Sequence, residues 1–318
     1  MILPLACLAG AGWADQSAVT HTQSQSRKPR FHFLLAQAAG AHATLSQRVE
    51  AAAKSLDRFF ATDKTFDEET NTYLRLRFET VVDKDLGLSF KPDVKVRLDL
   101  PRTKRSLKLL LETDPDDSRR RTSQSTPVES LEKQDYFLSL ERTARRAGRW
   151  DVRPAAGIRL DWPPDPFMRL RAIRYFPLRH PWLLRTAGQL FWFGSRGVGA
   201  RTDADFDRAL SATLLFRSTT TLSWTEDDNF ARAAERLFLF QYLDPRQSIV
   251  YELDYQAKDD PRWAADRFGF QIRYRKRVYG KWLFMELTPR LSYSSENHFD
   301  PDPSFTLRLE AVFGREYL

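Results

Sequence analysis

The chain's clearest pattern is an alternation of apolar and charged residues that begins near residue 73. In the stretch YLRLRFE, residues 73–79, the apolar parity holds Leu74, Leu76 and Phe78. The other parity holds Arg75, Arg77 and Glu79. Successive side chains of a β-strand point to opposite faces, so a strand here has one apolar and one charged face.

This period of two continues almost to the C-terminus. Residues 86–100 repeat it, with Lys91, Asp93, Lys95 and Arg97 on the charged parity. Near residues 230–242 the same template places Phe230, Ala234, Phe238 and Tyr242 on the apolar face. The pattern predicts an all-β fold of about 14 strands, within a range of about 12 to 16.

Two architectures use such strands: a soluble sandwich or barrel with the apolar face inward, and a membrane barrel with it outward. Trp150 and Trp162 share a parity and bracket the apolar positions between them. About 12 residues at ~3.3 Å, inclined by ~45°, rise ~28 Å along the membrane normal. This is close to the ~25 Å apolar band between the aromatic girdles of membrane barrels.

The links between the expected strands are the next indication. Counting from a periplasmic N-terminus, every second link is short: 101–105, 145–148, 177–181, 209–212, 243–246 and 279–281. The intervening links include the long polar stretches 114–133, 258–266 and 295–303. Short turns at one rim and larger loops at the other are typical of outer-membrane barrels. We therefore expect a single antiparallel transmembrane β-barrel over residues 65–318.

The N-terminal region has a different composition. Residues 1–14 are uncharged and mainly apolar and end in small residues, which predicts a secretory signal peptide, with a buried strand or helix as the alternative. Residues 15–43 are rich in Gln, Ser and Ala and predict a flexible periplasmic segment. Residues 44–64 include helical spacing of Val49, Ala53, Leu56 and Phe60, which predicts a short helix packed at the periplasmic rim or plugging the barrel.

Composition excludes several classes of protein. The 318 residues have a mean hydropathy of -0.52, and no apolar run of about 18 residues suggests a membrane-spanning helix. The net charge of +8 comes from basic residues interleaved with acids, whereas a nucleic-acid binder clusters them. Cys7 is the single cysteine and lies in the expected signal peptide, so disulfides and thiolate metal sites are not expected in the mature chain.

The last expected strand, FTLRLEAVFG, carries Phe305, Leu307, Leu309 and Phe313 on one parity. Here the sequence resembles bacterial outer-membrane barrels, whose final strand alternates apolar residues and ends in an aromatic that the barrel-assembly machinery recognises. The tail Arg315–Leu318 departs from that pattern. The stretches ARTDADFDRAL, 200–210, and YGKWLFMELTPRLSYS, 279–294, resemble an uncharacterised family of proteobacterial outer-membrane proteins over residues 44–318. This resemblance implies a location and a barrel, and no activity.

A membrane barrel with these faces turns its charged parity into the lumen. The lumen-facing candidates are Arg75, Arg77, Glu79, Lys91, Asp93, Lys95, Arg97, Arg153, Arg159, Arg273 and Arg275. A basic wall favours anions, so one expected function is a pore or binding lumen for small anionic solutes. The alternative is a sealed structural or adhesive barrel, filled by ion-paired side chains and acting through loops 114–133 and 295–303. The expected partners are outer-membrane lipid and the assembly machinery, without nucleic acid.

Catalysis is not expected from the residues. Three histidines, His21, His32 and His42, precede the strands, and His180 falls in an expected turn. His298 lies in the polar loop SSENHFDPDPS with Asp300 and Asp302, where a solvated loop explains them without a metal or hydrolytic site. No pair of histidines has ligand spacing and no glycine-rich phosphate loop follows a strand. The sequence predicts no enzyme, no metal site and no cofactor.

Overall fold

The computed structural model describes residues 59, 72–84, 87–99, 107–113, 136–142, 150–160, 162–178 and 182–314. The expected signal peptide 1–14, the segment 15–43 and, apart from Phe59, the expected helix in 44–64 lie outside these residues. Loop 114–133 lies outside them as well. No helix in the described part of the chain has the length and apolarity needed to cross a bilayer.

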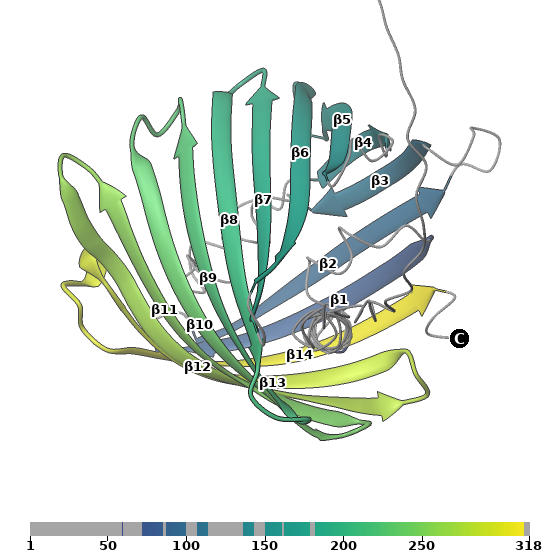
Figure 1. The fold of residues 1–318 in the computed structure, drawn as a ribbon, viewed down its shortest axis with the longest axis vertical. Coiled ribbons are helices and arrows are strands. Elements are labelled where there is room, and N and C mark those ends of the chain that lie inside the picture. Colours follow the sequence, from purple (N-terminus) through teal and green to yellow (C-terminus); the bar gives the residue numbers. More distant parts are fainter. Residues whose placement is uncertain are drawn as a thin grey trace, which may run out of the picture. The chain divides into compact units, whose positions relative to one another are not determined.

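The described strands form one closed antiparallel barrel of 14 strands, which confirms the predicted fold class (Figure 1). The strands are β1 Tyr73–Asp83, β2 Gly87–Asp99, β3 Leu107–Thr113, β4 Tyr136–Arg142, β5 Asp151–Arg159, β6 Asp165–Pro177, β7 Trp182–Phe193, β8 Gly197–Ala209, β9 Leu214–Thr225, β10 Ala231–Asp244, β11 Gln247–Asp259, β12 Trp263–Tyr279, β13 Leu283–Ser294 and β14 Asp302–Gly314. A 3-10 turn, η2, covers Ser295–Asn297 before β14.

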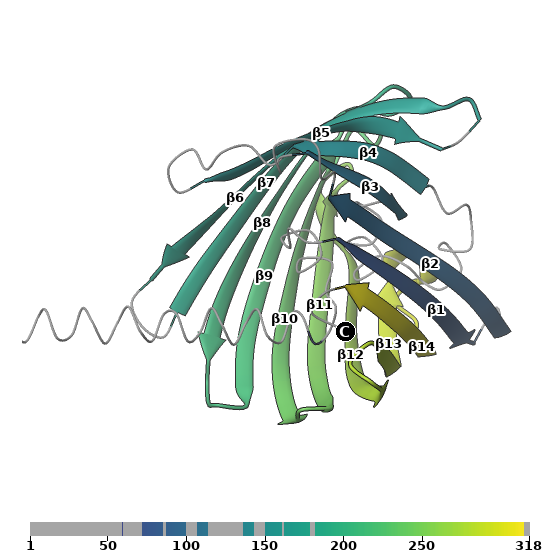
Figure 2. The same ribbon diagram turned by 90° about the vertical axis from the view of Figure 1, so that its right-hand side faces the viewer.

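The barrel closes by pairing its first strand with its last. Each strand pairs with its neighbours in the chain, and β1 pairs with β14 from Tyr73 opposite Gly314 to Asp83 opposite Ser304. The purple β1 and the yellow β14 accordingly lie side by side in Figures 1 and 2. We call the rim that holds the start of β1 and the end of β14 the terminal rim, and the other the opposite rim.

The outer face is apolar and edged by aromatic residues. Phe78, Phe90 and Leu309 project from the barrel with between 44% and 68% of their surface exposed. Trp192, Trp224, Tyr255 and Trp263 are exposed near the opposite rim, and Trp150, Tyr279 and Phe313 near the terminal rim. An outward apolar band between two aromatic girdles is the surface of a barrel that spans a membrane.

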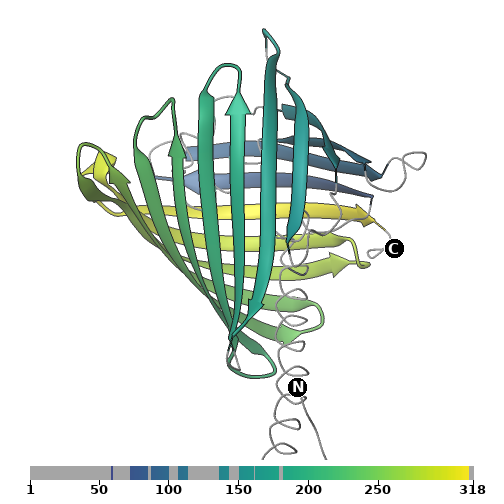
Figure 3. The ribbon, with the colours of Figure 1, turned by 45° about the horizontal axis from the view of Figure 1, so that its top comes forward.

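The predicted link lengths need correction. The stretch 258–266 was expected to be a long loop, but β11 continues to Asp259 and β12 begins at Trp263 (Figure 3). The two polar strand ends stay paired, and the Lys258 ammonium lies 3.0 Å from the Asp266 carboxylate. Residues 194–196 also form a short link at the opposite rim. The described links of the terminal rim, 210–213, 245–246 and 280–282, are short as predicted, whereas the opposite rim holds short links as well as the longer link 295–301.

The predicted faces are wrong for one strand, β10. Its expected apolar positions Ala234 and Phe238 point inward, because both lie on the parity of buried Arg236 and Phe240. The outward positions are Ala233, Glu235, Leu237 and Leu239. The run Leu237–Phe240 is apolar on both parities, so alternation could not identify its outer face.

The inner face has three zones along the barrel. Charged side chains fill the middle. Phe137, Phe167 and Phe193 pack together near the opposite rim, with ring centroids between 5.3 and 5.9 Å apart. Near the terminal rim, inward apolar residues form two clusters, made of Leu183, Leu215, Phe238, Phe240 and Val250 and of Tyr73, Phe284 and Val312.

Phe59 contacts both clusters at the terminal rim. Its ring meets Phe284 edge to face at 5.9 Å and Tyr242 at 6.5 Å. Such aromatic pairs contribute about 0.5–1.5 kcal/mol beyond the area they bury. A residue that precedes the strands therefore packs against the inner wall of the barrel.

Candidate functional site

The inner wall carries many charges of both signs. Among the described residues, 13 lysines and arginines and 12 aspartates and glutamates are buried. Burying a charge without a partner costs several kcal/mol, so such a wall is stable only if the charges pair. The geometry shows two distinct ways in which they do so.

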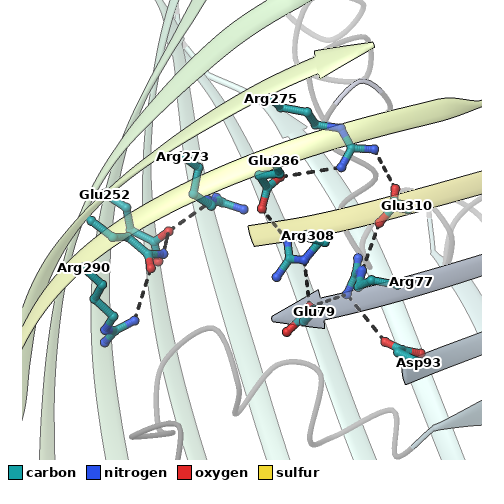
Figure 4. Close-up of polar contacts among 11 residues, drawn as sticks. Arg77, Glu79, Asp93, Glu252, Arg273, Arg275, Glu286, Arg290, Arg308 and Glu310 are labelled. Atoms are coloured by element: carbon teal, nitrogen blue, oxygen red, sulfur yellow. Dashed lines mark hydrogen bonds and ion pairs between the residues drawn. The ribbon is translucent and has the colours of Figure 1, made fainter. Parts of the chain in front are cut away.

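The first is a cyclic network across the closing strands, which we call the seam ring (Figure 4). It consists of Arg77 and Glu79 on β1, Arg275 on β12, Glu286 on β13, and Arg308 and Glu310 on β14. The Glu310 carboxylate accepts from Arg77 Nε at 2.9 Å and from Arg275 at 2.6 Å.

The other members complete the seam ring. Arg308 contacts Glu286 and donates from Nε to Glu79 at 2.7 Å. Glu286 lies 3.6 Å from Arg275, and Glu79 lies 4.0 Å from Arg77. Every carboxylate in the seam ring therefore lies between two guanidinium groups. Charge-assisted bonds of this kind are stronger than neutral ones.

The second arrangement lies on β8, where Asp203, Asp205 and Asp207 alternate along the inner face; we call it the aspartate ladder. Asp205 accepts from Arg185 at 2.8 Å and from the Thr219 hydroxyl at 2.7 Å. Asp207 accepts from Arg217 at 2.5 and 2.9 Å.

The third rung of the ladder follows the same plan. Asp203 accepts from Arg201 at 3.0 Å and from the Thr221 hydroxyl at 2.7 Å. The donors of the ladder come from β8 itself and from its neighbours β7 and β9. Each aspartate is thus held locally.

The two signs of charge do not reach equally far into the lumen. Four arginines, Arg77, Arg273, Arg290 and Arg308, keep between 11% and 20% of their side chains exposed. Their partners Glu310, Glu252, Asp254 and Glu286 are at most 1% exposed. Figure 4 shows these arginines from β1, β12, β13 and β14. Solvent inside this part of the barrel therefore meets these four guanidinium groups and the Glu79 carboxylate, which is 19% exposed, while the other four carboxylates are buried beneath the arginines.

The other lumen candidates from the sequence also lie on the inner parity. Arg75 is 3.6 Å from Asp93, Arg97 is 3.9 Å from Glu141, and Lys91 and Lys95 are buried. Near the two rims, Arg153 pairs with Asp151 at 2.6 Å, and Arg159 pairs with Asp165 at 3.0 Å. Arg159 also donates to the Ser195 hydroxyl at 3.0 Å. Arg275, in the seam ring, contacts the Phe284 ring at 4.3 Å.

Sequence reasoning missed most of the partners of these residues. The missed side chains are Arg185, Asp203, Asp205, Asp207, Arg217, Glu286, Arg290, Arg308 and Glu310. All of them lie on inward positions of the same alternation that identified Arg75 and Arg77, so the alternation could have predicted that they face the lumen. The alternation could not have predicted which of them pair, because pairing depends on the register between strands.

The loop around His298 contains no assembled site. His298 follows η2 in a left-handed conformation with φ of 50°, while Asp302 starts β14 and is buried. In the part of the chain that the structure describes, no group of three or more His, Cys, Asp and Glu side chains could hold a metal ion. His21, His32, His42 and His180 lie outside it.

The expected assembly-signal residues lie on the outer face of β14. Phe305, Leu309 and Phe313 are exposed there, and Phe313 stacks on Trp282 with the ring centroids 5.3 Å apart. Leu307 shares their parity and lies opposite Thr80 and Leu287. Recognition of these residues by the assembly machinery stays a prediction.

No protein-family model matches the sequence. None of the curated proteins matches it either. Solved structures do match the fold. A loop-deletion variant of OmpT, an outer membrane protein of Vibrio cholerae, has a TM-score of 0.50 at 9% identity, covering 76% of this chain and 98% of that chain. The outer membrane channel DcaP of Acinetobacter baumannii has a TM-score of 0.43 at 8% identity, covering 76% and 96%. The KdgM porin has a TM-score of 0.36 at 7% identity, covering 75% and 99%.

These similarities concern the fold alone. The closed barrel, the apolar outer face and the aromatic girdles, with the fold shared with the OmpT variant, identify the chain as a β-barrel of the bacterial outer-membrane type, located in that membrane.

Proposed function

We propose that the barrel is a porin-like protein whose lumen admits and binds small anionic solutes. One observation supports this most directly: the exposed arginines Arg77, Arg273, Arg290 and Arg308 stand over buried carboxylates. Rings of basic side chains in a pore raise the local concentration of anions and lower that of cations. A passing carboxylate or phosphate would meet several guanidinium groups in sequence, each able to bind it through two hydrogen bonds.

The ion pairs beneath the arginines explain why such a wall is stable. Each carboxylate offsets part of the repulsion between neighbouring guanidinium groups. It also holds the side chain of its arginine in a fixed orientation at the lumen wall. Arg290 illustrates this, because its Nη2 bonds Asp254 at 3.1 Å and its Nη1 bonds Gln271 at 3.4 Å while the side chain keeps 12% exposure.

Reversal potentials in planar bilayers test the proposal. Purified protein in a salt gradient should give a potential of the sign set by anion preference. The double variant Arg273→Gln and Arg290→Gln should shift that potential toward zero, because it removes two exposed lumen charges. Arg174→Gln is the matched control, since Arg174 lies on the outward parity and packs over Trp150 and Phe176, so its loss should leave the potential unchanged.

A sealed barrel that acts through its loops is the second candidate. It is supported by Phe59, which packs on the inner apolar clusters of the terminal rim. Bilayers that show no conductance steps, despite correctly folded protein, would favour it over the pore. Deletion of residues 114–133 should then abolish binding to surfaces while the barrel still assembles.

A further inference from the structure

The outer face of the barrel carries one polar region, on β7 to β10. Among the described outward side chains that lie between the two girdles, Glu235 is the single carboxylate. It lies four residues along β10 from Ala231, which pairs with the girdle residue Trp224. Four residues at ~3.3 Å, inclined by ~45°, place Glu235 ~9 Å below that girdle. Ionisable residues at such depth cost free energy and usually have a partner.

Two hydroxyl groups hold the Glu235 carboxylate on the outer surface. The Ser218 hydroxyl donates to Oε1 at 2.5 Å and the Thr220 hydroxyl to Oε2 at 2.6 Å, both from the adjacent strand β9. A carboxylate has about four acceptor sites, so these bonds leave capacity for further donors. The side chain is therefore fixed in orientation and can still accept further hydrogen bonds.

Small residues predominate in the row of this carboxylate and in the next row toward the opposite rim. The register places Thr186, Ala204, Thr220 and Glu235 in one row across four strands. The next row toward the opposite rim holds Gly188, Thr202, Leu222 and Ala233. We call these two rows, together with Ser218, the Glu235 patch. Small residues on a lipid-facing surface allow another backbone to approach closely.

The Glu235 patch also contains hydroxyl groups, whose hydrogen bonds lipid acyl chains cannot satisfy. The Thr186 hydroxyl is buried by its neighbours and has no hydrogen-bond partner. The Thr202 hydroxyl belongs to an exposed side chain. Acyl chains neither donate nor accept hydrogen bonds, so both hydroxyls and the carboxylate are poorly solvated by lipid.

We propose that the Glu235 patch is the contact surface for a second copy of this chain. The patch is self-complementary, since it offers the exposed Thr202 hydroxyl on β8 as a donor and the Glu235 carboxylate on β10 as an acceptor on the same face. A two-fold contact between identical faces brings the donor of one copy to the acceptor of the other. This inference is independent of the proposed pore, because it concerns the opposite face of the wall.

The test is the oligomeric state of the full barrel. Wild-type protein extracted in a mild detergent should have, by light scattering, a mass that is a multiple of the single chain. Ala204→Trp places a large side chain in the patch and should weaken self-association at least tenfold. Ala156→Trp is the matched control, because Ala156 is an exposed outward residue of β5 far from β8 in strand order, and it should leave the mass unchanged.

Glu235→Leu is a second variant. It replaces a carboxylate on the lipid-facing surface with an apolar side chain, so the barrel should still fold. It should also weaken association at least tenfold, with the heat-dependent gel shift of the barrel unchanged. A wild-type chain that is monomeric in detergent and in cross-linked membranes would overturn the proposal. Cross-linked products whose mass shows a different protein, or a Glu235→Leu barrel that associates like wild type, would overturn it as well.

Discussion

The seam ring and the aspartate ladder neutralise similar charges by different means. In the seam ring, Glu310 is shared by Arg77 and Arg275, and Glu286 by Arg275 and Arg308. In the ladder, Asp205 bonds Arg185 and the Thr219 hydroxyl, and Asp207 has Arg217. The ring joins residues as far as 233 positions apart, whereas the Arg185–Asp205 pair spans 20. Because arginines are shared between the carboxylates of the ring, whereas the hydrogen bonds of the ladder run to a different arginine for each aspartate, coupling between residues should be stronger in the ring than in the ladder.

The largest effect is expected where one buried carboxylate serves two arginines. Glu310→Ala leaves Arg275 and Arg77 without their closest acceptor, and should lower the free energy of unfolding by about 3–5 kcal/mol. Urea unfolding in lipid vesicles, followed by tryptophan fluorescence, measures this. Thr306→Ala, on the same inner face of β14, is the control and should change stability by about 0.5 kcal/mol or less. Equal losses in the two variants would contradict the role of the ring.

The next test compares the two regions by asking whether the stability effects of two substitutions add. Glu286→Gln and Glu310→Gln share Arg275, so their double mutant should depart from the sum of the single effects by about 0.5–3 kcal/mol. Asp203 bonds Arg201 and Asp207 bonds Arg217, so the effects of Asp203→Asn and Asp207→Asn should add within about 0.5 kcal/mol. The measurement is the same unfolding experiment on four single and two double variants. Non-additive effects of Asp203→Asn and Asp207→Asn as large as those in the seam ring would contradict the difference between the two regions.

The smallest expected effect concerns the threonine hydroxyl groups, which bond aspartates of the ladder but none of the carboxylates of the seam ring in the contacts described above. Thr219→Val keeps the shape of the side chain but removes the donor to Asp205 at 2.7 Å. We expect a loss of about 0.5–1.5 kcal/mol, the usual net contribution of one hydrogen bond. Thr306→Val is the matched control on the inner face of β14. A loss no larger than that of Thr306→Val would mean that Arg185 alone satisfies Asp205.

Alternation was sufficient to predict the barrel, the number of strands and the charged inner parity. It succeeds for residues such as Leu76 and Arg77 because side-chain direction in a strand depends on sequence position alone. It could not predict that Arg77 meets Glu310, since this contact depends on how the first and last strands align. The exposure of the arginines above their carboxylates also depends on three-dimensional packing.

The alternation predicted the wrong outer face for β10, and the physical reason is the apolar inner cluster at the terminal rim. Phe238 and Phe240 look like lipid-facing residues, but they line the inner apolar cluster at the terminal rim. The alternation therefore predicted that Glu235 faces the lumen, and it did not indicate a carboxylate on the outer face. The prediction of a loop over residues 258–266 was also wrong. The composition of this stretch is typical of a loop, but polar residues at the two strand ends, such as Lys258 and Asp266, pair with each other.

The seam ring also makes the barrel depend on completed synthesis. Arg77 and Glu79 leave the ribosome long before Arg308 and Glu310, which lie more than 220 residues later and supply their partners across the seam. A chain released without β14 would keep the ring members on β1, β12 and β13 but would lack Arg308 and Glu310, which join them. Such a product could neither pair its first strand with its last nor neutralise the buried charges that the last strand leaves behind.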